Sequence, residues 1–377
     1  MKILHLNVAR HLSPGQTKQL RFEFHAAKQL EVAVWDTLAY HNGPVTEPFV
    51  RAIPGLFRSM FMRKLFGWIV ALRLSSQYDI VLMRHMTFDP FAPVFGPFIR
   101  NRISVHHSKE VAELRLIREG WKGRAASALE RFSGRAAARH AVALFGVTRE
   151  IAEYERDLHS RDKPIGVCPN GINPEHVPVL DDKRDAHAVV AAFICGTFSP
   201  WHGLDKLMTA VDAQAGTHHE ALPRIHLIGQ LSDEQMCQIA ATEARRRVFQ
   251  AHGLMSEEQY RPILAECDVG IASLALERKS LREASTLKVR EMLAMGLAVY
   301  SGHDDVALPP EEPFVAVVAA PDISGLVAFG MAVKHVPREI VRERSLRRVT
   351  KLDSLLGTVT RISEVLAQSR ASNSMGS

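Results

Sequence analysis

The sequence predicts an α/β protein built from two doubly wound, Rossmann-like domains. Short runs of Val, Ile and Leu recur without polar alternation, which is typical of parallel strands that are buried on both faces. Helical patterns separate these runs, and strand–helix alternation favours a doubly wound sheet. The 377 residues exceed one ordinary core, and a polar stretch at 178–186 interrupts the alternation once. Two domains in tandem are therefore expected.

The first half of the chain supplies the elements of one domain, which we place at 1–168. Its strands are predicted at 2–8, 31–36, 79–85, 103–107, 141–147 and 165–168. Its helices are predicted at 16–29, 56–74, 123–139 and 149–157.

The second half repeats the pattern, and we place the second domain at 169–370. Its strands are predicted at 189–195, 225–228, 248–251, 269–272 and 298–301, with helices between them. The last helical stretch, 338–368, is a candidate to cross back to the first domain. The polar residues 371–377 are expected to form a disordered tail. Two such sheets would bring the carboxyl ends of their strands to a shared cleft, where ligands of open α/β sheets bind.

Composition narrows the class of protein. Hydrophobic residues make up 46% and charged residues 23%, the balance of a soluble globular protein. The apolar run at 65–72 is far shorter than the ~20 residues of a membrane span. The N-terminus enters a strand pattern without the apolar core of a signal peptide. Four scattered cysteines with no C-x-x-C pair indicate reduced packing residues rather than a disulfide or zinc framework. We expect a cytoplasmic protein without a metal site.

The net charge of +6 favours anionic partners such as nucleotide diphosphates or acidic phospholipid. Neither zinc-finger spacing nor the aromatic-basic strands of RNA-binding domains occur, so nucleic acid is not an expected partner.

The segment at 267–296 carries the clearest chemical signal. A strand at 269–272 leads through a polar loop into a helix that is predicted to begin near Leu287. Ser285 and Thr286 are suitable N-cap residues, and Gly296 is a suitable terminator. The unpaired amides of a first helical turn attract a diphosphate, and Lys288 would add a full charge.

Two glutamates accompany this helix. Glu291 lies in its second turn, within reach of ribose hydroxyls, and Glu283 precedes it in the loop. A simpler interpretation exists for the same residues, because a Ser-Thr pair caps many helices and two glutamates eight apart occur by chance. Spacing alone leaves a phosphate site and a plain capped helix both open.

The same residues resemble a known motif. Glu283 and Glu291 form the E-x7-E pattern of retaining GT-B glycosyltransferases of the large family four, and EASTLKVREMLAMGLAVYS is similar to the E-A-S-P-L-K version of it. Further stretches resemble family motifs in the expected order: FGVTREI (145–151), CPNGIN (168–173), GTFSPWHGLDKLM (196–208), LIGQ (227–230) and AHGLMSEEQY (251–260). The resemblance covers about 141–301 with specific motifs and the rest in architecture.

The resemblance implies two Rossmann-like domains facing across a cleft, with the acceptor in the first and a nucleotide-sugar donor in the second. It implies that Glu291 binds the donor ribose, that Glu283 contacts the transferred sugar, and that Lys288 supports the diphosphate. The other implied donor-binding residues are Gly15, Gly196, Ser199, His202, Gly253, Leu254, Ser285, Thr286 and Leu287, with Gly253 and Leu254 near the nucleobase.

The sequence departs from the family where relatives carry Arg and Lys to clamp the pyrophosphate. Those places hold Ser199, Trp201 and His202, and Lys206 follows one turn later. The clamp would therefore depend mainly on Lys288, with Lys279 and Arg282 as further candidates from the preceding loop. Thr286 replaces the usual proline.

Two features of the first half, at His106 and at Gly15, can each be interpreted either as part of a functional site or as ordinary structure. In VHHSKE (105–110), His106 stands where the family often has a histidine that contacts the transferred sugar, whereas a histidine at a strand end is also an ordinary polar cap. Only one of His106 and His107 would face a cleft, since adjacent strand residues point to opposite sides. Gly15 stands where relatives have a glycine pair, and a simple loop explains it equally.

A basic, aromatic stretch at 49–78 contains no acidic residue before Asp79. Such a stretch is suited to an anionic membrane surface, which many members of the resembled family use to reach lipid acceptors. A core helix with snorkelling arginines is the alternative. The basic residues concerned are Arg51, Arg58, Arg63, Lys64 and Arg73.

The expected activity is transfer of a sugar from a UDP- or GDP-type donor to a glycan or polyprenol-linked acceptor, with retention, without metal and without a cofactor. His106, Glu283 and Lys288 are the expected catalytic residues. The expected location is cytoplasmic, with the inner face of the membrane as a candidate surface. Two alternatives remain: a nucleotide-sugar epimerase of the same fold, and a degenerate homologue that binds nucleotide without turnover.

Overall fold

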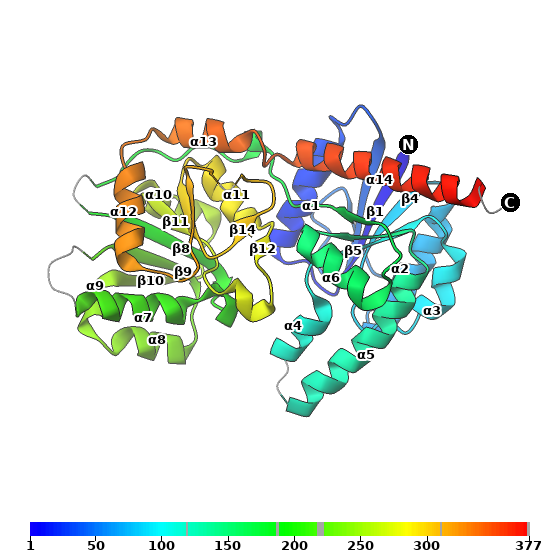
Figure 1. The fold of residues 1–377 in the computed structure, drawn as a ribbon, viewed down its shortest axis with the longest axis horizontal. Helices are drawn as coiled ribbons and strands as arrows, with labels where there is room; N and C mark the ends of the chain where they lie inside the picture. The colour runs from blue at the N-terminus through cyan, green and yellow to red at the C-terminus, as the bar shows by residue number, and fades with distance from the viewer. Residues whose placement is uncertain (118–119, 186–187, 217–221, 310, 375–377) are drawn as a thin grey trace. The chain divides into compact units, whose positions relative to one another are not determined.

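The computed structural model describes residues 1–117, 120–185, 188–216, 222–309 and 311–374 (Figure 1). The chain forms two compact units. Unit 1 comprises Met1–Asn173 together with the C-terminal segment from Thr350, and unit 2 comprises Pro174–Val349. The first unit therefore continues past the expected boundary at 168, and the final helix belongs to it.

The core of unit 1 is a seven-stranded sheet in the order β3-β2-β1-β4-β5-β6-β7. All its recorded pairings are parallel, as the unbroken apolar runs predict. The chain winds outward in both directions from the β1–β4 pair, which makes the sheet doubly wound. Its strands are β1 (Lys2–Val8), β2 (Val34–His41), β3 (Val50–Ala52), β4 (Ile80–Arg84), β5 (Arg102–His106), β6 (Ala143–Gly146) and β7 (Ile165–Val167).

Both faces of this sheet are covered, because alternate strand residues point to opposite sides. Ile80 and Leu82 of β4 belong to one apolar cluster, and Val81 and Met83 belong to another. The helices are α1 (Pro14–Ala27), α2 (Met60–Ser75), α3 (Ala92–Phe95), α4 (Glu110–Ile117), α5 (Gly120–Arg139), α6 (Arg149–His159) and α14 (Lys351–Ser374), with 3-10 turns η1 (Gly55–Phe57) and η2 (Gly96–Phe98).

The C-terminal helix α14 is part of the core of unit 1. Leu355, Val359 and Ile362 pack in the same apolar cluster as the strands β1, β4 and β5. Lys351 forms a buried ion pair with Glu23 of α1, with 3.3 Å between Nζ and Oε2. Figure 1 shows α14 beside α1 and β1. The expected disordered tail is wrong for residues 371–374, which continue this helix, and 375–377 lie outside the described residues.

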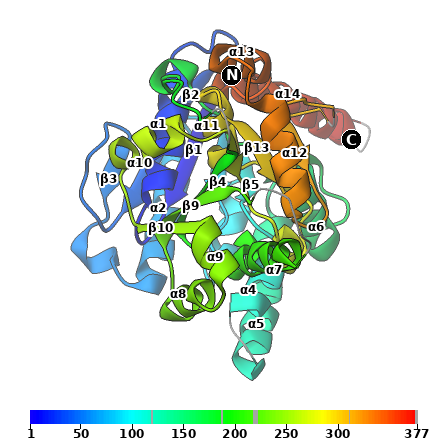
Figure 2. The ribbon, with the colours of Figure 1, turned by 90° about the vertical axis from the view of Figure 1, so that its left-hand side faces the viewer.

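The core of unit 2 is a six-stranded parallel sheet in the order β10-β9-β8-β11-β13-β15. Figure 2 shows α7, α8 and α9 gathered on one side of this unit. Its strands are β8 (Val190–Thr197), β9 (Arg224–Gln230), β10 (Phe249–Gly253), β11 (Val269–Ile271), β13 (Ala298–Ser301) and β15 (Val315–Val317). A separate short pair is formed by β12 (Glu283–Ala284) and β14 (Asp304–Asp305).

The remaining elements of unit 2 surround this sheet. The helices are α7 (Leu204–Ala215), α8 (Asp233–Ala240), α9 (Glu243–Val248), α10 (Glu257–Ala265), α11 (Leu287–Ala294), α12 (Ile323–Val333) and α13 (Arg338–Leu346). The 3-10 turns are η3 (Pro174–His176), η4 (Pro200–His202) and η5 (Leu276–Lys279). Among the described residues, no helix combines the length and apolar character that crossing a membrane requires.

Two expected helices have different limits. The stretch predicted as one helix at 338–368 is divided into α13 and α14. Between the two helices the chain passes from unit 2 to unit 1 and forms a bridge with an earlier segment of the chain. Ile172 and Thr350 form an isolated bridge, and the Lys351 amide donates to the Ile172 carbonyl at 2.7 Å. The helix expected at 56–74 begins only at Met60, where the Ser59 side chain accepts a hydrogen bond from the Met62 amide.

Candidate functional site

Helix α11 begins without a side-chain cap. Thr286 occupies its N-cap position, yet its hydroxyl accepts no capping hydrogen bond. By contrast, Thr148, Ser232 and Ser256 each cap their own helices by accepting from an amide in the first turn. The expectation that Thr286 caps α11 is therefore wrong, and the first-turn amides remain suited to an anion. The expected terminator is confirmed, because Gly296 follows the helix with φ +81°.

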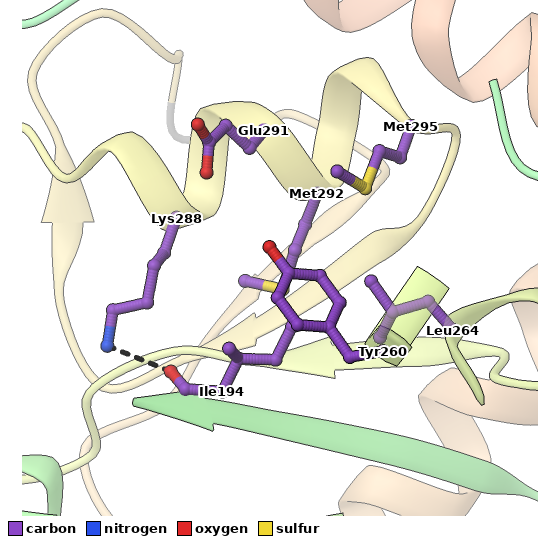
Figure 3. A pocket seen from close by; sticks show the side chains of 7 residues that line it. All are labelled: Ile194, Tyr260, Leu264, Lys288, Glu291, Met292 and Met295. Carbon is purple, nitrogen blue, oxygen red and sulfur yellow. Dashed lines mark hydrogen bonds between the residues drawn. The ribbon is translucent and has the colours of Figure 1, made fainter. Parts of the chain in front are cut away.

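Lys288 joins the start of α11 to the end of β8. Its Nζ donates to the Ile194 carbonyl at 2.9 Å and contacts the Cys195 sulfur at 3.4 Å (Figure 3). Ile194 lies near the carboxyl end of the central strand β8, the edge at which open α/β sheets bind ligands. The side chain is only partly buried, so its charge is held at this edge while water can still reach it.

A pocket in unit 2 contains both Lys288 and Glu291. Figure 3 shows the Tyr260 phenol pointing toward the turn of α11 that bears them. Burial, followed by the nearby charges of Glu257 and Glu291, raises the pKa of Tyr260, so its hydroxyl stays a donor at neutral pH. The pocket is lined by Ile194, Tyr260, Leu264, Lys288, Glu291, Met292 and Met295. Sequence reasoning assigned no role to Tyr260, and its place at the end of AHGLMSEEQY was the one signal that could have found it.

The two glutamates of the E-x7-E pattern are positioned by a buried ion pair that sequence reasoning missed. Glu283 lies on β12, which pairs with β14. Asp305 of β14 accepts two hydrogen bonds from Arg290 of α11, at 2.6 and 3.1 Å, and both side chains are almost fully buried. The pair therefore ties the helix that carries Glu291 to the strand pair that carries Glu283.

The loop after β8 is a tight turn with a neutral histidine. The Ser199 amide donates to His202 Nδ1 at 2.8 Å, so the hydrogen of the neutral ring is on Nε2. Burial, and then the charges of Lys288 and Lys279, lowers the pKa of His202 to about 3. Gly203 follows with φ +76°, and a Cβ there would lie 3.0 Å from atoms of Leu274. Gly196, which is exposed, precedes the turn.

This histidine predicts a specific response to acid. Between pH 6.5 and about 3 the unfolded state binds a proton at His202 that the folded state does not, so stability falls as pH is lowered through this window. Protonation would also remove the acceptor that Nδ1 offers to Ser199. We expect His202→Gln to lose less stability than the wild type between pH 7 and pH 4.5 in urea unfolding. The exposed His335→Gln is the matched control, and an equal acid loss in all three proteins would contradict the prediction.

Other cations of these loops are engaged within unit 2. Lys206 pairs with Glu277 at 2.6 Å, and Arg278 pairs with Asp205 at 2.6 Å. These pairs hold η5 against η4 and the start of α7. Lys279 lies over the Trp201 ring, with Nζ 4.8 Å from the ring centroid. Its positive charge also helps to lower the pKa of His202. Of the expected clamp candidates, Lys288 and Lys279 thus lie beside the β8 loop, and Lys206 serves to fasten η5.

The residues expected near the nucleobase lie at the end of β10. Gly253 ends this strand with φ +73°, and no other atom lies within 4 Å of the position that a Cβ would take there. Leu254 follows with 67% of its surface exposed. A capping box between Ser256 and Gln259 then starts α10, the helix that carries Tyr260. An exposed apolar side chain beside a glycine with free space around it could pack against a flat ring such as a nucleobase.

Two expected site residues of unit 1 lie in a helix and in a buried cluster. Gly15 lies in the first turn of α1, which begins at Pro14 behind a capping box of Ser13 and Gln16. His106 is only 1% exposed, and its ring nitrogens contact Ser104 at 3.1 Å and Glu110 at 3.2 Å. His106 is therefore buried within unit 1, and a catalytic role for it stays a prediction.

A cluster of histidines and glutamates explains this burial. His106 stacks on His85 with 4.5 Å between ring centroids, and His85 Nε2 lies 2.6 Å from Glu130. Glu155 of α6 lies 3.7 Å from His106 and 3.2 Å from His159. Imidazoles and carboxylates thus alternate inside unit 1, although Glu155 Oε1 and His159 Nδ1 are buried without a hydrogen-bond partner among the described residues. His107, one residue on, is partly buried, and burial lowers its pKa well below the usual value.

Of the comparisons with known proteins, the one with solved structures supports the fold. No family model matches the chain, and no curated protein sequence matches it. Among solved structures, it is similar to the lipopolysaccharide outer core galactosyltransferase WaaB (12% identity, TM-score 0.60, 97% of this chain and 99% of that one). It is also similar to sucrose-phosphate synthase from Thermosynechococcus elongatus (14%, 0.65, 98% and 100%) and to Anabaena Alr3699/HepE in complex with UDP-glucose (16%, 0.60, 98% and 100%). The predicted fold of two Rossmann-like domains, as in GT-B glycosyltransferases, is confirmed.

Proposed function

We propose that the chain is a glycosyltransferase that moves a sugar from a UDP- or GDP-type donor to a glycan or polyprenol-linked acceptor. The observation that carries the proposal is the placing of Lys288 and Glu291 on the first two turns of α11, whose N-terminus has no side-chain cap. Both residues line one pocket at the carboxyl end of β8. The fold supports the proposal, since WaaB is a galactosyltransferase and the HepE complex contains UDP-glucose.

Each donor group has a candidate partner in unit 2. The diphosphate would accept hydrogen bonds from amides at Ser285, Thr286 and Leu287, with the charge of Lys288 beside them. Glu291 would accept hydrogen bonds from the ribose hydroxyls. Gly196, Ser199 and the Nε2–H of His202 would lie at the opposite side of the diphosphate, Gly253 and Leu254 at the base, and Glu283 at the transferred sugar.

The chemistry assigned to these residues is electrostatic. As the anomeric bond breaks, negative charge builds on the leaving diphosphate, and fixed dipoles with one full positive charge stabilise it. The proposal gives this role to the α11 amides and Lys288 rather than to a metal ion or a cofactor. Two further features complete the proposal. Retention at the anomeric carbon derives from the resemblance around Glu283 and Glu291, and work at the cytoplasmic face of a membrane derives from the basic stretch at 49–78.

The proposal predicts a loss of nucleotide affinity in Glu291→Gln. Removing an ionised acceptor of hydroxyl hydrogen bonds costs roughly 1.5–3 kcal/mol, which is about 10- to 150-fold in affinity. Isothermal titration with UDP and GDP would measure it. The exposed Glu258→Gln on α10 is the matched control and should bind as the wild type does. Equal affinity of both variants would remove Glu291 from the donor site.

A panel of UDP- and GDP-sugars tests the reaction itself. Transfer to a glycan or polyprenyl phosphate acceptor supports the proposal. Conversion of the donor sugar without an acceptor would show an epimerase, and nucleotide binding without any product would show a non-catalytic homologue. Either result would overturn the proposal.

A further inference from the structure

Besides the pocket of unit 2, the structure contains a pocket in unit 1. It is lined only by residues of unit 1, and none of them is acidic. The pocket has a volume of about 400 Å³, and its polar lining consists of Arg10, His11, Asn42, Arg58, Ser59 and Arg63. Arg10 follows β1 and Asn42 follows β2, so the pocket lies at the carboxyl end of the sheet, where open α/β sheets bind ligands. Arg58 and Arg63 come from the turn before α2 and from its first turns.

Asn42 holds the two arginine-bearing segments together. Its amide donates to the Arg10 carbonyl at 3.0 Å, and its side-chain Nδ2 donates to the Arg58 carbonyl at 3.0 Å. The Oδ1 atom of Asn42 is buried and accepts no hydrogen bond from the described residues. The pocket is therefore built by specific backbone contacts, and it offers one acceptor as well as several donors.

The arginines of this pocket have no counter-charge. Within the residues that the structure describes, Arg10, Arg58 and Arg63 form no ion pair, whereas Arg21 and Arg245 each contact a carboxylate. The Nη1 atom of Arg63 is buried and donates no hydrogen bond there. Burial, and then the charge of Arg10, lowers the pKa of Arg63. A bound anion would relieve this repulsion and take the unused donors.

The hydrogen-bond donors of this pocket and the apolar surface beside it indicate which kind of anion it would bind. Guanidinium forks match phosphate oxygens, and Asn42 Oδ1 suits a hydroxyl of a phosphate or an adjoining sugar. Met60 lines the pocket and is 51% exposed. Two further large apolar side chains are close to its lining residues in sequence and face solvent: Phe61 is 51% exposed, and Leu56 is 87% exposed. A phosphate with an apolar tail would use both features.

We propose that this pocket binds the phosphate group of a lipid-linked acceptor, with the lipid chain against Leu56, Met60 and Phe61. The inference rests on the proposed glycosyl transfer and gives it an acceptor class. It also revises the expected membrane contact of the basic stretch. Lys64, counted there as a surface charge, is buried and donates to the carbonyls of Thr87 and Phe88 at 2.6 Å each.

The test compares binding of a short polyprenyl monophosphate and of inorganic phosphate to the full chain. We expect the polyprenyl phosphate to bind more tightly than inorganic phosphate, and Arg58→Gln/Arg63→Gln to weaken it by about tenfold or more. Arg73→Gln, which removes an exposed charge from the other end of α2, is the matched control and should bind as the wild type does. Thermal unfolding of each variant checks that the fold is intact.

Several outcomes would overturn the proposal. Equal affinity of the double variant and the wild type would remove the arginines from the site, and equal affinity for inorganic phosphate would remove the lipid tail. Equal binding of all proteins to any anionic vesicle, with or without polyprenyl phosphate, would show a general charge effect. Titration of the same proteins with UDP separates the two proposals: retained UDP binding with no polyprenyl phosphate binding defeats only this one, and the reverse defeats only the donor site.

Discussion

Asp305→Ala is expected to lower the free energy of unfolding of unit 2 by roughly 3–5 kcal/mol. Arg290 is fully buried, and Asp305 accepts two of its hydrogen bonds, so the variant would leave a buried guanidinium without that carboxylate. Such a loss is a large part of the roughly 5–15 kcal/mol that stabilises an ordinary domain. Urea unfolding at neutral pH would measure it, and the lost contact would also free β14 from α11.

The control for this prediction is an ion pair at the surface. Glu343 pairs with Arg347 at 3.5 Å, and both side chains are exposed, so Glu343→Ala should cost at most about 1 kcal/mol. A double replacement, Arg290→Met with Asp305→Leu, should recover much of the stability, because apolar side chains of similar volume replace buried ion pairs well. If Asp305→Ala costs no more than Glu343→Ala, Arg290 finds another acceptor and the ion pair does not hold α11.

The sheets could be predicted from the sequence because their strands are buried on both faces. The run at 269–272 is apolar without interruption and contains β11, and the run at 2–8, which forms β1, is buried from Ile3 to Val8. The edge strands β3 and β15 were missed. Most of their residues are exposed or only half-buried, so neither is a strand that is buried on both faces. The division at Val349 was missed for another reason: the residues on both sides are good helix formers, and the Ile172–Thr350 bridge that interrupts them is a tertiary contact.

The candidate site was predictable where its residues are close in sequence. Lys288 and Glu291 are three residues apart, so helical geometry alone places them next to each other on one face of α11. Tyr260 reaches the same pocket from α10, and only the fold brings it there. Arg290 could not be recognised, because a charged residue beside Glu291 on a short helix has the pattern of an exposed side chain, whereas the structure buries it against Asp305. The burial of His106 could not be predicted, because two adjacent histidines at a strand end give no signal of which one points inward.

Lys288→Met is expected to lower kcat/KM for the nucleotide sugar by roughly 10²–10³-fold, the usual effect of removing one group that stabilises transition-state charge. Methionine keeps the length and helix propensity of lysine but removes the charge beside the leaving diphosphate. Because Glu291 would still hold the ribose, UDP or GDP affinity should fall much less than turnover does. Initial rates at several donor concentrations, with titration of the nucleotide, would separate the two effects.

The matched control is Lys206→Met, which removes the same charge from a nearby residue of unit 2 that pairs with Glu277. Its turnover should stay within a few fold of the wild type, because that lysine fastens η5 and is assigned no contact with the donor. A Lys288→Met protein with full turnover would exclude the clamp. So would a loss of turnover that is matched in Lys206→Met, or one accompanied by a fall in Tm large enough to unfold the variant at the assay temperature. In each of these cases the hydrogen bond from Lys288 to the Ile194 carbonyl would have only a structural role, which is to join α11 to β8.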